Sequence, residues 1–218
     1  MRTHLRLKNR QPRKLPAEFR DQDLRYTEEL VATFLRQYTR PGDLVLDPFA
    51  GYGTTLIAAQ AMDRVPYGVE FDARRAAYIR SQLRQPSQLF HGDSRQLLRH
   101  PIPPCDFSIT SPPFMAQGDP EDPFTNYSAD GSGYGAYLRD LAGIYAQVRQ
   151  LMKPGARVVL EVSNLKGPEG VTTLAWDVAR ELSAVLRFEG EVVIGWDTYG
   201  YGYDHSYCLV FRCDERDA

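Results

Sequence analysis

Short apolar runs alternate with amphipathic stretches along most of the chain. Thr27 is a suitable N-cap for a helix that ends near Tyr38, since two glutamates follow it and apolar residues recur on one face. Apolar runs bounded by turn residues predict strands, and stretches rich in Ala and Leu between them predict helices. The expected strands are 43–47, 65–70, 88–90, 105–110, 156–162, 189–196 and 206–212, and the expected helices are 27–38, 54–62, 73–83, 94–98, 136–152 and 171–186.

This order of elements predicts an α/β fold with a doubly wound, mostly parallel sheet, because strands that alternate with helices pair in parallel and are covered on both faces. The last two strands are joined by the aromatic, glycine-rich run DTYGYGYDH and are expected to pair as an antiparallel hairpin. Residues 115–135 are dense in Gly, Pro, Asp and Ser, which indicates a long loop. Loops of that length are usually functional or mobile.

The composition fits one soluble domain. The chain has 218 residues, of which 43% are hydrophobic and 25% are charged, so a sizeable core is possible and disorder is disfavoured. No apolar run approaches the roughly 20 residues of a membrane-spanning helix. The three cysteines are odd in number and lack CxxC spacing, and no stretch resembles a signal peptide. We therefore expect a cytoplasmic, reduced protein with no metal site and no membrane partner.

Charge is distributed unevenly between the N-terminus and the rest of the chain. Residues 1–20 carry seven Lys or Arg against the single acid Glu18, a net charge of +6, whereas the whole chain has a net charge of -2. A basic arm at 1–25, ahead of a single domain at 26–218, is a candidate for contact with phosphate groups. A solvated terminus explains the same charges equally well.

The run DPFAGYGTT, residues 47–55, lies between a predicted strand and a predicted helix, at the sheet edge where open α/β folds bind ligands. Gly51 and Gly53 allow the backbone to approach a ligand closely. The run is not a phosphate loop, because no Lys follows, and it lacks the third glycine of the dinucleotide fingerprint. Glu70 and Asp93 end the next two strands. Each alone is more often a cap or a solvated acid, but together they describe a pocket for a nucleoside.

Residues 110–114, Thr-Ser-Pro-Pro-Phe, end the fourth predicted strand and form the most specific motif. Two prolines stiffen the turn, because each fixes φ and lacks an N–H group. An exocyclic amino group on a base becomes nucleophilic when acceptors bind both of its hydrogens. The Ser111 side chain and the Pro112 carbonyl are suitable acceptors, and Phe114 can stack on the base.

The motifs resemble the DNA cytosine-N4/adenine-N6 branch of the S-adenosylmethionine-dependent methyltransferases. DPFAGYGTT is similar to that family's DPFAGSGTT cofactor loop, TSPPF to its TSPPY motif, and YTEELV to its segment over the methionine end of the cofactor. The resemblance implies a Rossmann-like class I fold with a seven-stranded sheet and a C-terminal antiparallel hairpin. It implies S-adenosylmethionine as cofactor. The implied cofactor-binding residues are Tyr26, Thr27, Asp47, Phe49, Gly51, Gly53, Thr54, Glu70, Phe71, Asp93 and Ser94, and the implied catalytic residues are Ser111, Pro112, Pro113 and Phe114.

The chain departs from the family pattern at Tyr52, where the family often has Ser, and at Phe114, which lacks a hydroxyl. It also has no segment long enough for a separate target-recognition domain. Recognition would then depend on the 115–135 loop, the basic arm or the tyrosines of 199–203.

Ser before Pro-Pro favours cytosine N4 of DNA as the methyl acceptor in this family. Adenine N6, amino groups in tRNA or rRNA, and a non-catalytic nucleic-acid-binding subunit are the alternatives, and the oligomeric state, including a homodimer, is left open.

Overall fold

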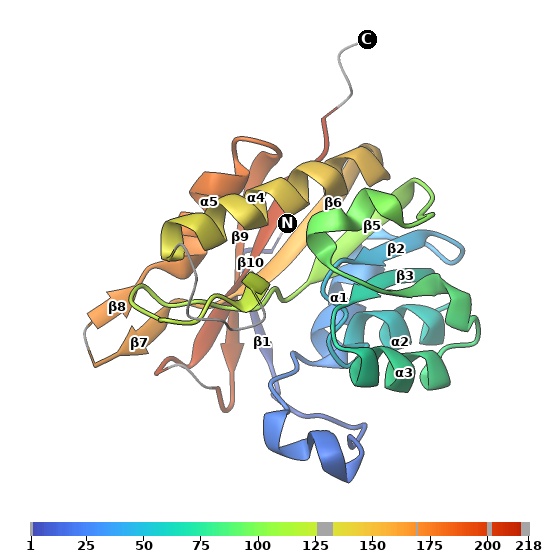
Figure 1. Ribbon diagram of the computed structural model, residues 1–218, viewed down its shortest axis with the longest axis horizontal. Helices are drawn as coiled ribbons and strands as arrows, with labels where there is room; N and C mark the ends of the chain where they lie inside the picture. Colours follow the sequence, from blue (N-terminus) through green and yellow to red (C-terminus); the bar gives the residue numbers. More distant parts are fainter. Residues whose placement is uncertain (1, 126–132, 169, 200–201, 215–218) are drawn as a thin grey trace.

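The computed structural model describes residues 2–125, 133–168, 170–199 and 202–214, and Figure 1 shows their arrangement. An eight-stranded sheet has the strand order β1-β9-β10-β6-β5-β2-β3-β4. Its strands are β1 (His4–Leu7), β2 (Leu44–Asp47), β3 (Val65–Glu70), β4 (Leu89–His91), β5 (Cys105–Thr110), β6 (Met152–Val162), β9 (Arg187–Trp196) and β10 (His205–Arg212). The helices are α1 (Glu28–Tyr38), α2 (Thr54–Ala61), α3 (Ala73–Gln82), α4 (Tyr134–Leu151) and α5 (Leu174–Leu182), with short 3₁₀ helices at Ala17–Gln22, Pro86–Gln88, Ser94–Arg99 and Pro123–Thr125.

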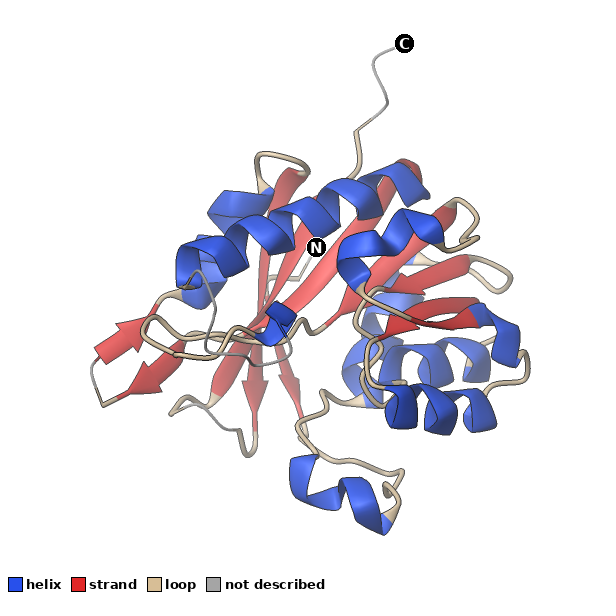
Figure 2. Cartoon of the chain, in the orientation of Figure 1, coloured by secondary structure: helices blue, strands red, loops and turns tan. Residues whose placement is uncertain are grey.

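The expected parallel sheet with a C-terminal antiparallel hairpin is present. Strands β4, β3, β2, β5 and β6 run parallel, and β10 pairs antiparallel with both β6 and β9. Helices α4 and α5 cover one face of the sheet, whereas α1, α2 and α3 cover the other, as Figure 2 shows. Alternate residues of the same strand therefore enter different cores: Leu160 of β6 packs on the α4 side, and Val159 packs on the α1 side.

The sheet contains one strand more than the seven expected. Strand β1 comes from the predicted basic arm and pairs in parallel with β9, with Leu5 opposite Ile194. Leu15 and Phe19, further along the arm, are also buried. The first 25 residues thus contribute to the sheet and to a small apolar cluster. The sequence did not predict β1, because the alternating run His-Leu-Arg-Leu lies among charged side chains and has only four residues. A run that short indicates a strand only when the neighbouring strand is known.

The predicted helix at 171–186 is wrong at both ends. Strands β7 (Leu165–Gly167) and β8 (Gly170–Thr172) form a separate two-stranded antiparallel ladder, with Val171 opposite Lys166, before α5 begins at Leu174. Helix α5 ends at Leu182. The β-branched Val171 suits a strand, and the helix starts only where apolar residues four apart can reach the core.

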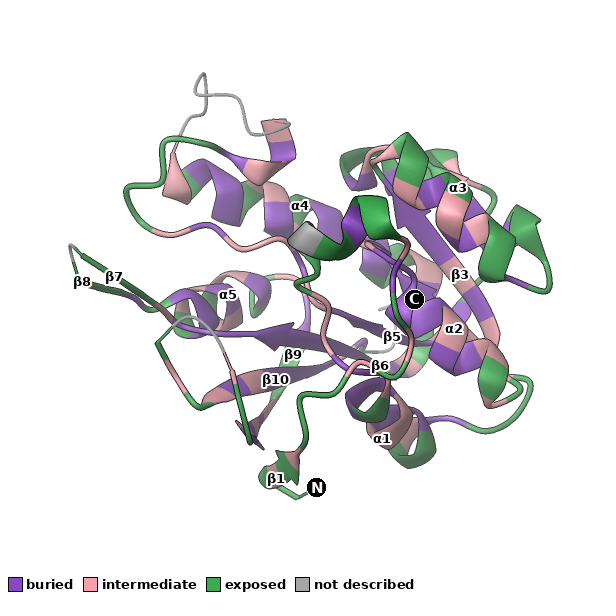
Figure 3. Cartoon of the chain, turned by 90° about the horizontal axis from the view of Figure 1, so that it is seen from below, coloured by how far each residue is buried: buried purple, intermediate pink, exposed green. Residues whose placement is uncertain are grey.

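The carboxyl ends of the parallel strands meet at one edge of the molecule, which carries the motif residues. Figure 3 views the molecule from below and shows that β3 and β6 are largely buried. Asp47, Glu70 and Thr110 are the last residues of β2, β3 and β5. None of the described helices combines the length and the apolar character that a membrane crossing requires.

Candidate active site

The loop between β2 and α2 depends on two glycines in the left-handed region of backbone conformation. Gly51 has φ +56° and Gly53 has φ +79°. Gly53 is the N-cap of α2, and a Cβ there would lie 3.0 Å from Cγ2 of Ile79. Any other residue would be strained at Gly53 and would collide with α3. The loop therefore needs the glycine that the sequence places there.

Asp47 connects this loop to the strand that carries the Ser-Pro-Pro motif. It is 1% exposed, and its Oδ1 accepts hydrogen bonds from the backbone N–H of Phe49 at 2.9 Å and from Thr110 Oγ1 at 2.6 Å. Burial raises the pKa of Asp47 to about 6, and neighbouring hydroxyls partly oppose that shift. Asp47 does not line the cavity described below, so its place is behind the loop.

Glu70 is the buried carboxylate that faces the glycine loop. It is 6% exposed, and its oxygens accept hydrogen bonds from the backbone N–H of Gly51 at 2.7 Å and of Asp72 at 2.9 Å. Burial raises the pKa of Glu70 to about 7, although these hydrogen bonds and Arg75 favour the charged form. Each oxygen keeps a further lone pair, which leaves Glu70 able to accept hydroxyl groups from a ligand in the cavity.

Among the residues that follow β3 and β4, some are open to the cavity and others are hydrogen-bonded to neighbouring residues. Phe71 is 54% exposed at the cavity, which is unusual for a phenylalanine. Asp93 also lines the cavity, but Arg95 donates from Nε to its Oδ1 at 3.2 Å and from Nη2 to its Oδ2 at 2.8 Å. Ser94 donates to the carbonyl of Pro48 and so fastens this turn to the cofactor loop. A contact between Asp93 and an adenine amino group stays a prediction.

The Ser-Pro-Pro-Phe turn lies in the same cavity as the glycine loop. Ser111, Pro112, Pro113 and Phe114 all line it. Tyr137 of α4 donates from its hydroxyl to the carbonyl of Pro113 at 2.9 Å, which anchors the turn on a buried helix. The turn is therefore held both by its own proline geometry and by the core.

Glu161, which the sequence motifs do not include, lies directly against this turn. It is 3% exposed on β6 and accepts a hydrogen bond from the hydroxyl of Tyr199 at 3.1 Å. Burial raises the pKa of Glu161, and the nearby hydroxyls of Ser206, Ser111 and Tyr199 oppose the shift. The sequence does contain a signal for it, since a single acid interrupts the apolar run Val-Val-Leu-Glu-Val at the carboxyl end of a strand.

Aromatic side chains form the wall of the cavity beside Glu161. The Tyr199 ring stacks on the Trp196 ring with centroids 5.7 Å apart and planes 9° apart. Of the tyrosine segment 199–203, residues 200–201 lie outside the described residues. In the long loop, Phe124 lines the cavity and stacks on Phe49 with centroids 5.8 Å apart, whereas residues 126–132 lie outside the described part.

One cavity of about 1470 Å³ joins these groups. The sequence-predicted residues that line it are Tyr26, Phe49, Gly51, Thr54, Glu70, Phe71, Asp93, Ser94, Ser111, Pro112, Pro113 and Phe114. Thr27, Asp47 and Gly53 do not line it: Thr27 and Gly53 are the N-caps of α1 and α2, and Asp47 supports the loop from behind. Within the described ranges, no group of three His, Cys, Asp or Glu side chains is placed to hold a metal ion.

Comparison with known proteins identifies relatives of the region around the glycine loop. Residues 6–81 match the family model described as DNA methylase. The Type II methyltransferase M.BglII of Bacillus subtilis is 40% identical over 47 residues, and M.MthZI of Methanothermobacter thermautotrophicus is 39% identical over 64 residues. These alignments cover 22% and 29% of this chain but only 13% and 18% of the two relatives.

Solved structures resemble a much larger part of the chain at low sequence identity. TrmN from Thermus thermophilus has a TM-score of 0.60 at 20% identity and covers 85% of this chain and 48% of its own. A SAM-dependent methyltransferase from Methanosarcina mazei has a TM-score of 0.58 at 12% identity and covers 83% of this chain and 97% of its own. These likenesses establish the fold. Residues 6–81 are therefore similar to the DNA amino-methyltransferase family, and the chain has the Rossmann-like class I methyltransferase fold.

Proposed function

We propose that the chain transfers a methyl group from S-adenosylmethionine to the exocyclic amino group of a base in DNA, and that this base is cytosine, methylated at N4. The observation that carries the proposal is that one cavity contains the glycine loop with Glu70 and also the Ser-Pro-Pro-Phe turn with Glu161 behind it. A cofactor and a flipped base can therefore meet in a shared space. A duplex target would have to be unstacked, at a cost of a few kcal/mol.

The residues on the loop side fit S-adenosylmethionine. Glu70 offers a buried carboxylate for the ribose hydroxyls, and the exposed Phe71 ring offers a surface for the adenine. Thr54 has a buried hydroxyl oxygen that lacks a partner within the described residues, as expected of a loop built to meet a ligand. When bound, the cofactor supplies an electrophilic methyl group and retains the electron pair of the broken carbon–sulfur bond.

The residues on the base side fit an amino group as nucleophile. The Pro112 carbonyl and Ser111 Oγ would accept its two hydrogens, so that the nitrogen lone pair is released from the ring and forms the bond to the methyl carbon. Phe114 would hold the base by stacking, which is worth about 1–3 kcal/mol per base. The methylated nitrogen then carries a positive charge and must lose one proton.

Glu161 provides a route for that proton. The Ser111 hydroxyl lies close enough to the Glu161 carboxylate to favour its charged form, so in the reacting complex the Ser111 oxygen would take a proton from the amine while its own proton passes to Glu161. The products are a neutral methylamine and a neutral carboxylic acid, and burial of Glu161 favours the neutral acid. A serine is a weak acceptor alone, and the carboxylate behind it compensates for that weakness.

Expression in a host without N4 methylation, followed by digestion of its DNA to nucleosides and mass spectrometry, tests the proposal. We expect N4-methylcytosine, reduced at least 100-fold by Ser111→Ala and by Glu161→Gln. Ser108→Ala is the matched control, because Ser108 lies on β5, which ends just before Ser111, is fully buried and has a hydroxyl without a partner in the described structure. Finding only N6-methyladenine would overturn the base assignment, and a chain that binds cofactor without methylating nucleic acid would indicate a binding subunit.

RNA is the second candidate substrate, because a structural neighbour is described as an RNA methylase. A candidate rRNA methylase from Clostridium thermocellum has a TM-score of 0.56 and covers 87% of this chain and 98% of its own. Folded RNA can be recognised largely by shape, which demands less of a small protein than reading a DNA sequence. Methylated nucleosides found only in tRNA or rRNA would favour this substrate over DNA.

A further inference from the structure

A row of aromatic side chains lies near the cavity but outside its lining. The ring centroids of Trp176 and Tyr207 are 4.9 Å apart. His205 continues the row, with its centroid 5.3 Å from that of Tyr207 and 5.2 Å from that of Tyr203. Lys166 ends the row, because its Nζ lies 4.1 Å from the centroid of the Tyr203 ring. These five residues are here called the aromatic row.

The start of β10 places the row beside the candidate active site. Tyr207 pairs with Val162, the last residue of β6, so this part of β10 is level with the carboxyl ends of the parallel strands. Side chains alternate across a strand, and Ser206 lies near Glu161 whereas Tyr207 packs on the side covered by α4 and α5. Leu165 of β7, the residue before the lysine of the row, lines the cavity. The row is therefore continuous with the rim of the cavity.

The small β7–β8 ladder carries the charged end of the row. Its two strands project from the body of the molecule (Figure 1 and Figure 3). Gly202 has φ +75°, and a Cβ at that position would lie 3.0 Å from the Cβ of Lys166. The glycine thus lets the turn before β10 pack closely on β7. Lys166 and Tyr203 come from separate elements that this close packing holds together.

The row is open to solvent and is fixed in position by its own contacts. Trp176 is 43% exposed although the Tyr207 ring contacts it, and exposed rings beside a cavity are typical of a binding surface. Both ring nitrogens of His205 have partners: Nδ1 lies 2.9 Å from Asp204 Oδ1, and Nε2 lies 3.1 Å from the Tyr207 hydroxyl. Rings that are held in place before a ligand arrives bind it at a lower entropy cost.

A row of rings that ends in one cation matches an unstacked base joined to a phosphate group. Every base has a π face, so aromatic side chains bind single-stranded nucleic acid with little dependence on sequence, and a basic residue meets the backbone. A target base that leaves its stack to enter a cavity deprives the adjacent bases of a stacking partner. A set of rings at the rim of that cavity is in the right place to replace it.

We propose that the aromatic row binds an unstacked base next to the target base, with Trp176 and Tyr203 as the stacking positions and Lys166 beside the adjoining phosphate. His205 and Tyr207 hold the two outer rings in place. The inference rests on the proposed function for the class of partner, a nucleic acid, and deepens it by assigning a binding surface outside the cavity. Trp176 and Lys166 lie outside the segments from which the sequence predicted recognition.

Binding of the full chain to two labelled strands tests this surface. One is single-stranded oligodeoxycytidine, and the other is an abasic oligonucleotide of the same length, which has the same phosphates but no bases. We expect Trp176→Ala and Tyr203→Ala each to raise the Kd for oligodeoxycytidine at least fivefold, because a stacking partner is lost, and to leave the Kd for the abasic strand within twofold. Both variants should bind S-adenosylmethionine as the parent does, which shows that the fold is intact.

Phe188→Ala is the matched control, because Phe188 is a 37% exposed ring, its centroid lies 5.2 Å from that of Phe211, and it lies near the start of β9, at the opposite edge of the sheet. It should bind both strands as the parent does. Row variants that lose both strands equally, or that bind oligodeoxycytidine as a binding parent does, would overturn the aromatic row and leave the proposed function standing.

The same titration with oligocytidine RNA separates the two kinds of nucleic acid. A selective loss seen with the RNA strand alone would keep the aromatic row and favour RNA as the substrate. A parent chain that binds neither strand and methylates no nucleic acid would overturn the proposed function itself, and with it this inference.

Discussion

At the scale of single residues, the raised pKa of Glu70 predicts a pH-dependent affinity for cofactor. Below pH about 7 the carboxyl group is mostly protonated, and a neutral acid is a poorer acceptor for ribose hydroxyls than a carboxylate. Affinity should therefore increase as the pH rises from 6 to 8. Glu70→Gln should abolish this dependence and weaken binding at pH 8 by about 1.5–3 kcal/mol, the usual worth of hydrogen bonds to a charged group.

Calorimetric titration with S-adenosylmethionine at several pH values measures this effect. Asp106→Asn is a suitable control, because Asp106 is an acid at the opposite end of the sheet that pairs with Lys153 at 2.6 Å. It should keep the pH dependence of the parent. A Glu70→Gln variant with an unchanged pH profile would mean that another group titrates in the cavity.

Single residues also mark the limit of what the sequence predicts about the site. Residues 65–70 and 105–110 form strands at the predicted bounds, so the positions of Glu70 and Ser111 at the sheet edge followed from local patterns. The importance of Glu161 did not, because it depends on the nearby hydroxyls of Ser206 and Ser111, which are 45 and 50 residues away in the chain. A sequence motif identifies residues that act through local backbone geometry. The surroundings of a buried carboxylate such as Glu161 are known only once distant strands have packed together.

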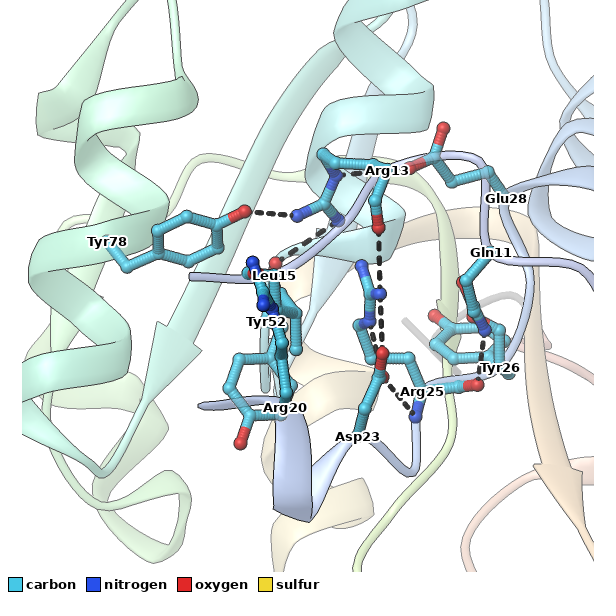
Figure 4. A network of polar contacts seen from close by, with 10 residues as sticks. All are labelled: Gln11, Arg13, Leu15, Arg20, Asp23, Arg25, Tyr26, Glu28, Tyr52 and Tyr78. Carbon is cyan, nitrogen blue, oxygen red and sulfur yellow. Dashed lines mark hydrogen bonds and ion pairs between the residues drawn. The ribbon is translucent and has the colours of Figure 1, made fainter. Parts of the chain in front are cut away.

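At the scale of structural elements, Arg13 and Tyr52 explain how residues 8–26, here called the strap, are held against the glycine loop. Arg13 donates to Glu28 at 3.2 Å, to the hydroxyl of Tyr78 at 2.6 Å and to the carbonyl of Tyr52 at 3.4 Å (Figure 4). The Tyr52 ring is 5% exposed, lies 5.4 Å from the Phe19 ring and has the Arg75 guanidinium 4.8 Å from its centroid. The residue stands where the related family often has Ser. The larger side chain thus supplies the apolar contact on which the 3₁₀ helix of the strap packs.

Tyr52→Ser should therefore destabilise the strap more than it harms the loop backbone. Removing a buried aromatic ring costs about 3–5 kcal/mol, and the loss should appear as faster protease cleavage within residues 14–24 and as a lower free energy of unfolding. Tyr52→Phe is the control: the Tyr52 hydroxyl is buried without a partner in the described structure, so its removal should be neutral or slightly stabilising. Equal cleavage of both variants would show that the strap is held by Arg13 alone.

At the scale of the whole molecule, the structure changes how the charge asymmetry should be tested. Deleting residues 1–14 would remove strand β1 and the Arg13 attachment together with the charges. Neutralising exposed side chains avoids that problem, since Lys8, Arg10 and Lys14 are all exposed and lie on the strap at the edge that carries the cavity. If these residues contact phosphates, each contact releases condensed counterions from the nucleic acid.

The triple variant Lys8→Gln, Arg10→Gln, Lys14→Gln should bind duplex DNA more weakly and with a shallower salt dependence. The slope of log K against log salt should fall in magnitude by about 2–3, since each phosphate contact contributes about 0.9. The matched control is Arg36→Gln, Arg40→Gln, Arg149→Gln, which removes three exposed cations at the opposite edge of the sheet and makes the same change in net charge. Equal slopes for the two triple variants would mean that only overall charge matters, and that Lys8, Arg10 and Lys14 make no specific contact with the nucleic acid.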